Sequence, residues 1–114
     1  MPDIVSIGEC MVELFGEAPL EKSHTFTRSF GGDTLNLLIA AQRLGSSTGF
    51  VTRVGDDAFA CYLLNAWQAE GVDISRCRKV SGFNAVYFIS VLPGGEREFA
   101  YYRRGSAASG LGPK

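Results

Sequence analysis

Gly31-Gly32-Asp33-Thr34-Leu35-Asn36 stands directly before the helix-patterned run Leu37-Leu38-Ile39-Ala40-Ala41-Gln42-Arg43-Leu44-Gly45. Two adjacent glycines let a backbone turn sharply and approach a ligand closely. We expect Asp33 or Thr34 to cap the helix, and the free N–H groups at a helix N-terminus favour hydroxyls or anions. An ordinary tight turn with a helix cap explains the same residues equally well. These residues alone therefore do not distinguish a ligand-binding site from an ordinary turn.

The order of predicted elements around this stretch is that of an α/β protein. Apolar periodicity predicts, in chain order, strand 3–7, helix 34–44, strand 50–54, helix 58–70 and strand 74–80. The helices stop at Gly45 and Gly71, and Asp56 or Asp57 is expected to cap the second one. Trp67 falls on the apolar stripe of that helix and is expected in the core. This alternation is typical of parallel strands joined by right-handed crossovers.

Four extended runs do not fit the alternation and are expected to form a second, smaller sheet beside the parallel core. They cover residues 11–15, 25–30, 85–91 and 98–103. The last two flank the turn Pro93-Gly94-Gly95-Glu96, which is a hairpin signal, so this sheet is expected to be antiparallel. The stretch from 105 to 114 is rich in glycine, serine and alanine and is interpreted as a linker without a terminating element.

The arms of the predicted hairpin carry Tyr87, Tyr101, Tyr102 and Arg103. Alternation along a strand puts Tyr101 and Arg103 on one face, and Tyr87 joins them if the register permits. Tyrosine rings and hydroxyls with one guanidinium suit a small molecule that carries hydroxyls and a carboxylate. A plain aromatic sheet surface with an edge charge explains these residues too. Glu9 lies at the C-terminal end of the first strand, which is where open parallel sheets bind ligands. A glutamate in a solvated turn would also be found at this position.

Composition excludes several other classes of function. The 114 residues carry a net charge of −1, which gives no basic field for nucleic acid, and no stretch is apolar enough to span a membrane. Cys10, Cys61 and Cys77 are widely spaced and distant from His24, so we expect reduced thiols in a cytoplasmic protein and no metal site. Neither a dinucleotide-binding glycine loop nor a P-loop is present.

Four motifs resemble one family when they are taken in order. Ile7-Gly8-Glu9-Cys10-Met11-Val12-Glu13-Leu14 and then Gly31 to Asn36 resemble the N-terminal region of ribokinase-like (PfkB) carbohydrate kinases. Arg53-Val54-Gly55-Asp56-Asp57-Ala58-Phe59, followed by Glu70-Gly71-Val72-Asp73, is similar to the next family signature. Within the family, the segments AWQAEGVDIS and GEREFAYYRRGSAAS look most like 2-keto-3-deoxygluconate kinases.

The resemblance implies a fold, a reaction and a set of contacts. The fold would be a partial three-layer α/β/α core with a small antiparallel β-sheet lid that often forms a dimer interface. The reaction would be phosphorylation of a sugar-acid hydroxyl by ATP with Mg²⁺. Asp33 and Asn36 would hold hydroxyls, and Arg103 would bind the carboxylate. The implied substrate-binding residues are Gly32, Asp33, Thr34, Leu35, Asn36, Tyr87, Tyr101, Tyr102 and Arg103.

The resemblance also implies what these residues do not supply. The family's Gly-Ala-Gly-Asp signature, which carries the catalytic aspartate, is not found in the 114 residues. We therefore expect residues 1–114 to be the N-terminal part of a single kinase domain, without the C-terminal nucleotide-binding part, and to be inactive alone. Two alternatives stay open: a fructokinase or ribokinase type of sugar kinase, or a non-catalytic fragment that binds sugar or dimerises through the lid.

Overall fold

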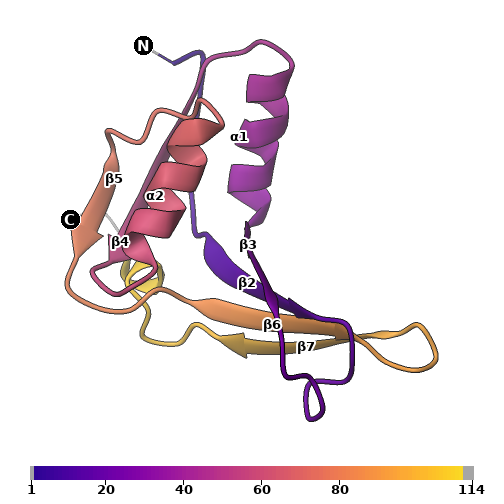
Figure 1. The fold of residues 1–114 in the computed structure, drawn as a ribbon. Helices are drawn as coiled ribbons and strands as arrows, with labels where there is room; N and C mark the ends of the chain where they lie inside the picture. The colour runs from indigo at the N-terminus through magenta and orange to yellow at the C-terminus, as the bar shows by residue number, and fades with distance from the viewer. Residues whose placement is uncertain (1, 112–114) are drawn as a thin grey trace.

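The computed structural model describes residues 2–111 and divides them between two sheets and two helices (Figure 1). The elements are β1 (Ile4–Ile7), β2 (Met11–Gly16), β3 (Thr27–Gly31), α1 (Asp33–Arg43), β4 (Thr48–Gly55), α2 (Ala60–Ala69), β5 (Cys77–Val80), β6 (Val86–Val91), β7 (Arg97–Tyr102) and the 3₁₀ helix η1 (Ala108–Gly110). The predicted α/β class is confirmed, and the predicted helices and strands appear with shifted ends.

The parallel sheet has the order β1-β4-β5. Both crossovers move in the same direction across this sheet, and right-handed crossovers then place both helices on one face. Figure 1 shows α1 and α2 side by side, with β4 running behind α2. Within residues 2–111 the core therefore has one helix layer and one sheet layer, and the second helix layer of the expected three is not formed by these residues.

The hydrophobic core lies between β4 and the two helices. Phe50 and Trp67 are fully buried and meet edge to face, with ring centroids 5.2 Å apart. Leu35 and Leu38 from α1 and Leu63 from α2 complete the same cluster, each without exposed surface. Burying one such side chain stabilises the fold by about 1.5–3 kcal/mol, which makes the helix stripes the main reason that the helices dock. The core position predicted for Trp67 is confirmed.

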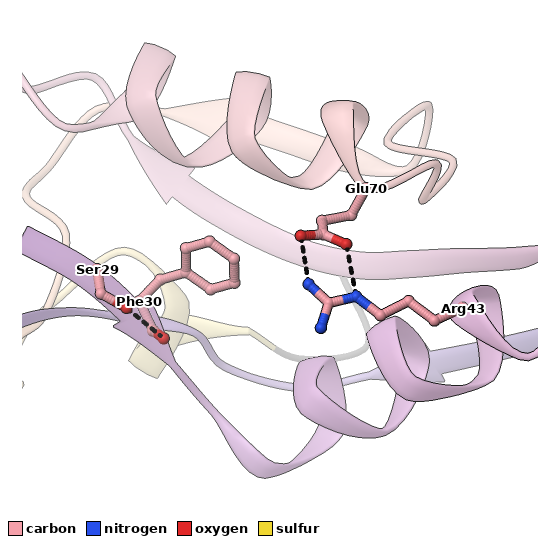
Figure 2. Close-up of polar contacts among 4 residues, drawn as sticks. All are labelled: Ser29, Phe30, Arg43 and Glu70. Atoms are coloured by element: carbon pink, nitrogen blue, oxygen red, sulfur yellow. Dashed lines mark hydrogen bonds and ion pairs between the residues drawn. The ribbon is translucent and has the colours of Figure 1, made fainter.

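Both helices end in the same way. Gly45 and Gly71 adopt positive φ values of 103° and 90°, and each glycine N–H bonds back to a carbonyl in the last turn. Arg43 at the end of α1 donates to Glu70 at the end of α2 through Nε at 3.0 Å and Nη2 at 2.7 Å (Figure 2). The predicted glycine stops are thus confirmed, and a two-bond ion pair links the two helix ends.

The predicted helix caps are wrong. Gly32 is the N-cap of α1 and Phe59 that of α2, and neither helix start has a side-chain capping bond. Asp33 lies inside the first turn of α1. The Asp56 and Asp57 carboxylates are instead engaged by Gly82 and by Asn84, which lie far along the chain. Asp57 also accepts the Phe59 N–H at 3.0 Å just before α2, so its carboxylate is shared between the helix start and the tertiary contact with Asn84.

The second sheet, called the lid here, has the order β3-β2-β6-β7 and lies across the lower end of the helices in Figure 1. Its β2–β3 and β6–β7 pairs are antiparallel, but β2 and β6 run parallel. The lid is therefore mixed rather than wholly antiparallel. The reason is that β2 and β6 are not joined by a hairpin: both enter the lid from the core and so point the same way.

Other differences concern the ends of elements. β5 begins at Cys77, because Asp73 and Ile74 accept bonds from Ser75 and Cys77 N–H groups and hold a turn there. The predicted linker contains η1, whose Gly110 carbonyl accepts a bond from Arg53 Nη1 at 2.8 Å. Residues 112–114 of that linker lie outside the described residues. No helix between residues 2 and 111 is long and apolar enough to cross a membrane.

Candidate functional site

A cavity of about 670 Å³ lies between the lid and the start of α1. Residues of the core and the lid share its wall, so it depends on how the two sheets are placed. The lining residues are Glu9, Met11, Gly31, Gly32, Asp33, Asn36, Tyr87, Phe99, Tyr101 and Arg103. Its size and its mixture of aromatic rings with a few polar groups are those of a small-molecule site.

The glycine stretch forms the core side of the cavity. A Cβ on Gly32 would stand 2.5 Å from the Glu9 backbone oxygen, so only glycine lets these two chain segments pass. α1 starts immediately afterwards, and its first backbone N–H groups have no acceptor within the helix. Asp33 and Asn36 line the cavity from this first turn. The start of α1 therefore offers an acceptor carboxylate and an amide to ligand hydroxyls.

An aromatic row forms the lid side. Tyr87 on β6 and Tyr101 on β7 are directly paired, and their rings stack with centroids 5.6 Å apart. Phe99 stacks on Tyr101 at 6.0 Å. The Tyr87 hydroxyl donates to the Glu13 carboxylate, and burial together with that bond raises the Tyr87 pKa. The row presents flat apolar surface, with the Tyr87 hydroxyl held by its own acceptor.

One cation stands at the cavity, and it is already paired. Arg103, immediately after β7, donates to Glu9 Oε1 through Nε at 2.9 Å and Nη2 at 2.8 Å. The Glu9 side chain is 19% exposed and that of Arg103 56% exposed. The pair thus joins the core loop after β1 to the end of the lid.

Three of the residues implied by the resemblance do not line the cavity. Leu35 is fully buried in the core, because it lies on the apolar stripe of α1. Thr34 packs its side chain against Gly8. Tyr102 lies on the opposite face of the lid, where it meets Phe88 edge to face, since successive strand residues alternate. The structure brings the other six together: Gly32, Asp33, Asn36, Tyr87, Tyr101 and Arg103.

Three residues at the cavity are not among those predicted from the sequence. Met11 and Phe99 line it beside Gly31 of the predicted glycine pair, and Glu13 holds Tyr87. A period-two pattern could have found most of them, because Met11 and Glu13 share one strand face and Phe99 shares a face with Tyr101. The sequence places Glu9 at a strand end where ligands bind, but no local sequence pattern links Glu9 to Arg103.

The described residues form no preassembled cluster of side-chain ligands for a metal ion. Between residues 2 and 111, no three histidine, cysteine, aspartate or glutamate side chains come together as a metal would need. Arg103, the cation at the cavity, is held by Glu9.

Comparisons with known proteins agree on one family. The pfkB family carbohydrate kinases match residues 1–111. The chain is 37% identical over 110 residues to 2-dehydro-3-deoxygluconokinase of Escherichia coli (strain K12), covering 92% of the chain and 34% of that protein. It thus spans about a third of the length of this relative.

Solved structures share the fold. The PfkB protein from Polaromonas sp. JS666 superimposes with a TM-score of 0.91 at 32% identity, over 98% of this chain and 38% of that one. Fructokinase with bound ATP from Xylella fastidiosa superimposes with a TM-score of 0.82 at 27% identity. The match covers 97% of this chain and 36% of that one. The arrangement of core and lid is therefore shared with these solved structures, and the chain belongs to the pfkB family of carbohydrate kinases.

Proposed function

We propose that the protein carrying these residues is a sugar-acid kinase that phosphorylates 2-keto-3-deoxygluconate at the expense of ATP. The position of the Arg103 side chain at the cavity is the main support for this proposal. Its guanidinium stands at a cavity whose other polar walls are two acids, Glu9 and Asp33, an amide and tyrosine hydroxyls. Neutral sugars need no cation, whereas a sugar acid needs one for its carboxylate. The relative from Escherichia coli, named for the same compound under its 2-dehydro synonym, supports the choice.

The described residues would act by binding and enclosing the sugar. Asp33 and Asn36 would bond its hydroxyls, because buried hydroxyls need specific partners. Tyr87 and Tyr101 would cover one face of the sugar with their stacked rings. The lid would keep out water that competes for the phosphoryl group.

The ATP and Mg²⁺ sites, and the catalytic base, would lie elsewhere in the same kinase domain, of which residues 1–114 are the N-terminal part. An exposed apolar surface on the core sheet supports this arrangement. The side chains of Val5 and Ile7 in β1 are 48% and 62% exposed, although strands of parallel sheets are ordinarily covered on both faces. A further layer of the domain would cover them. Residues 1–114 alone should then show no ATP-dependent turnover.

A fructokinase type of activity is the second candidate, and the Xylella fastidiosa structure favours it. With a neutral sugar, Arg103 would stay paired to Glu9 and contribute little to binding. A non-catalytic role, as a sugar-binding or lid-dimer fragment, is the third.

The lid would also be the contact between two copies in a cytoplasmic homodimer. Tyr102, on the face opposite the cavity, is 63% exposed, and Phe99 and Tyr101, on the cavity face, are 49% and 56% exposed. Exposed aromatic surface of this kind marks a contact with a ligand or another chain. Sedimentation of the protein at increasing concentration tests the dimer, and a strict monomer would contradict it.

The substrate is tested with Arg103→Ala and calorimetric titration against 2-keto-3-deoxygluconate and fructose. We expect the acid to lose roughly 2–4 kcal/mol of binding free energy, because its carboxylate loses its partner, and fructose to lose far less. Arg97→Ala removes the same charge from the start of β7, away from the cavity, and should change neither. Equal losses for both ligands would show that Arg103 is structural and would remove the support for an acidic substrate.

A further inference from the structure

We propose that Glu9 moderates the affinity of this cavity for an acidic ligand by occupying Arg103 until a ligand carboxylate takes its place. Glu9 is thus a stand-in for the substrate carboxylate, which a neutral sugar cannot displace. The inference rests on the proposed function, because it assumes that the ligand is a sugar acid.

The geometry of the pair is the first support. Glu9 and Arg103 are 94 residues apart, and the fold brings them together beside the cavity. Arg103 presents Nε and Nη2 to one carboxylate oxygen. These two donors form the edge of the guanidinium that a carboxylate grips with two parallel bonds. A ligand carboxylate that takes this edge therefore has to displace Glu9.

The charges that line the cavity are the second support. Glu9 and Asp33 are the acids in the lining and Arg103 is the base. An incoming carboxylate thus finds its cation already neutralised and a like charge next to it. Exchange keeps the guanidinium paired throughout, since one carboxylate replaces another. A neutral sugar offers no such replacement, so it leaves the Glu9–Arg103 pair intact.

The freedom of Glu9 is the third support. Its backbone is confined, because the Glu9 carbonyl lies against the Gly32 Cα. Its side chain is partly exposed, and Arg103 is more than half exposed. Release of Arg103 therefore needs only a side-chain rotation toward water, with no movement of the strand or loop that carries Glu9.

The test compares Glu9→Gln with the wild-type protein by calorimetric titration of 2-keto-3-deoxygluconate and fructose. The variant keeps the shape of Glu9 and removes its charge. We expect the acid to bind up to about fivefold more tightly, since an exposed ion pair no longer competes, and fructose to bind unchanged. The matched control is Glu70→Gln, which breaks the similar Arg43–Glu70 pair away from the cavity (Figure 2) and should alter neither affinity.

Unchanged or weaker binding of the acid by Glu9→Gln would overturn the inference, because Glu9 would then position Arg103 instead of competing for it. A second readout is the Arg103 Nε–H resonance in the wild-type protein. Exchange predicts that the acid shifts it and that fructose leaves it in place. If the wild type binds the acid and Arg103→Ala does not, but the resonance stays fixed, the exchange fails while the proposed function stands. If neither the wild-type protein nor Arg103→Ala binds the acid, the exchange and the proposed function both fail.

Discussion

Asn84 donates its side-chain amide to Asp57 Oδ1 at 2.6 Å and to the Gly55 carbonyl at 3.2 Å. Its own Oδ1 accepts the Gly55 N–H at 2.9 Å, and its backbone N–H donates to Asp57 Oδ2 at 2.8 Å. Asn84 lies two residues before lid strand β6, while Gly55 ends β4 and Asp57 leads into α2. This set of bonds therefore fixes the point at which the lid leaves the core.

Replacing Asn84 with alanine should destabilise the fold by about 2–3 kcal/mol. The change leaves the Gly55 N–H and carbonyl without their partner in a buried place, and each unsatisfied group costs free energy. Urea unfolding followed by circular dichroism measures the effect. Asn65→Ala, at an exposed position of α2, is the matched control and should stay within about 0.5 kcal/mol of wild type. Similar unfolding curves for the two variants would show that the bonds to Asn84 contribute little.

Stability should fall in acid partly because of Asp57. Burial opposes its ionisation, but bonds from Asn84 and the Phe59 N–H outweigh burial and hold the pKa of Asp57 below its usual value. A lowered folded-state pKa adds stability that is present above the unfolded-state pKa of about 4 and is lost as the pH falls through the folded value. The urea midpoint of Asp57→Asn should thus decline less than that of wild type below about pH 4. Parallel midpoint curves would contradict this.

Gly32→Ala should both destabilise the chain and close the cavity. The added Cβ would meet the Glu9 backbone oxygen, which cannot rotate away as a side chain could. We expect a loss of about 1–3 kcal/mol in unfolding free energy, as for other overpacked sites, together with weaker sugar binding. Gly94→Ala in the β6–β7 turn has no atom within 4 Å of the new Cβ and serves as the control. Near-wild-type unfolding of Gly32→Ala would mean that the two segments separate easily.

Alkylation should distinguish the three cysteines. Burial raises the pKa of Cys10 and of Cys77 to about 12, so neither forms appreciable thiolate near neutral pH. Cys61 is exposed on α2. Iodoacetamide at pH 8 followed by peptide mass spectrometry should find Cys61 modified first, and all three modified in urea. Rapid labelling of Cys10 in the native protein would show that the lid–core junction opens easily.

Local patterns determined the elements. Strand and helix positions follow from apolar spacing, and the stops at Gly45 and Gly71 follow from the need for positive φ, so each could be read from a few neighbouring residues. The shared face of Tyr101 and Arg103 was equally readable, because alternation is a property of one strand. The four family motifs could likewise be recognised from the sequence, because each is a short run of neighbouring residues.

The tertiary structure decided everything that joins distant segments. The pairing of Tyr87 with Tyr101 depends on hairpin register, and the parallel pairing of β2 with β6 depends on both strands leaving the core together. The Glu9–Arg103 pair spans 94 residues, and no local period encodes such a contact. The carboxylates expected to cap α2 bond Gly82 and Asn84 across the fold, and Asp57 keeps one local bond, from the Phe59 N–H. Sequence spacing fixes which side chains share a face, but only the packing of lid on core fixes which faces meet.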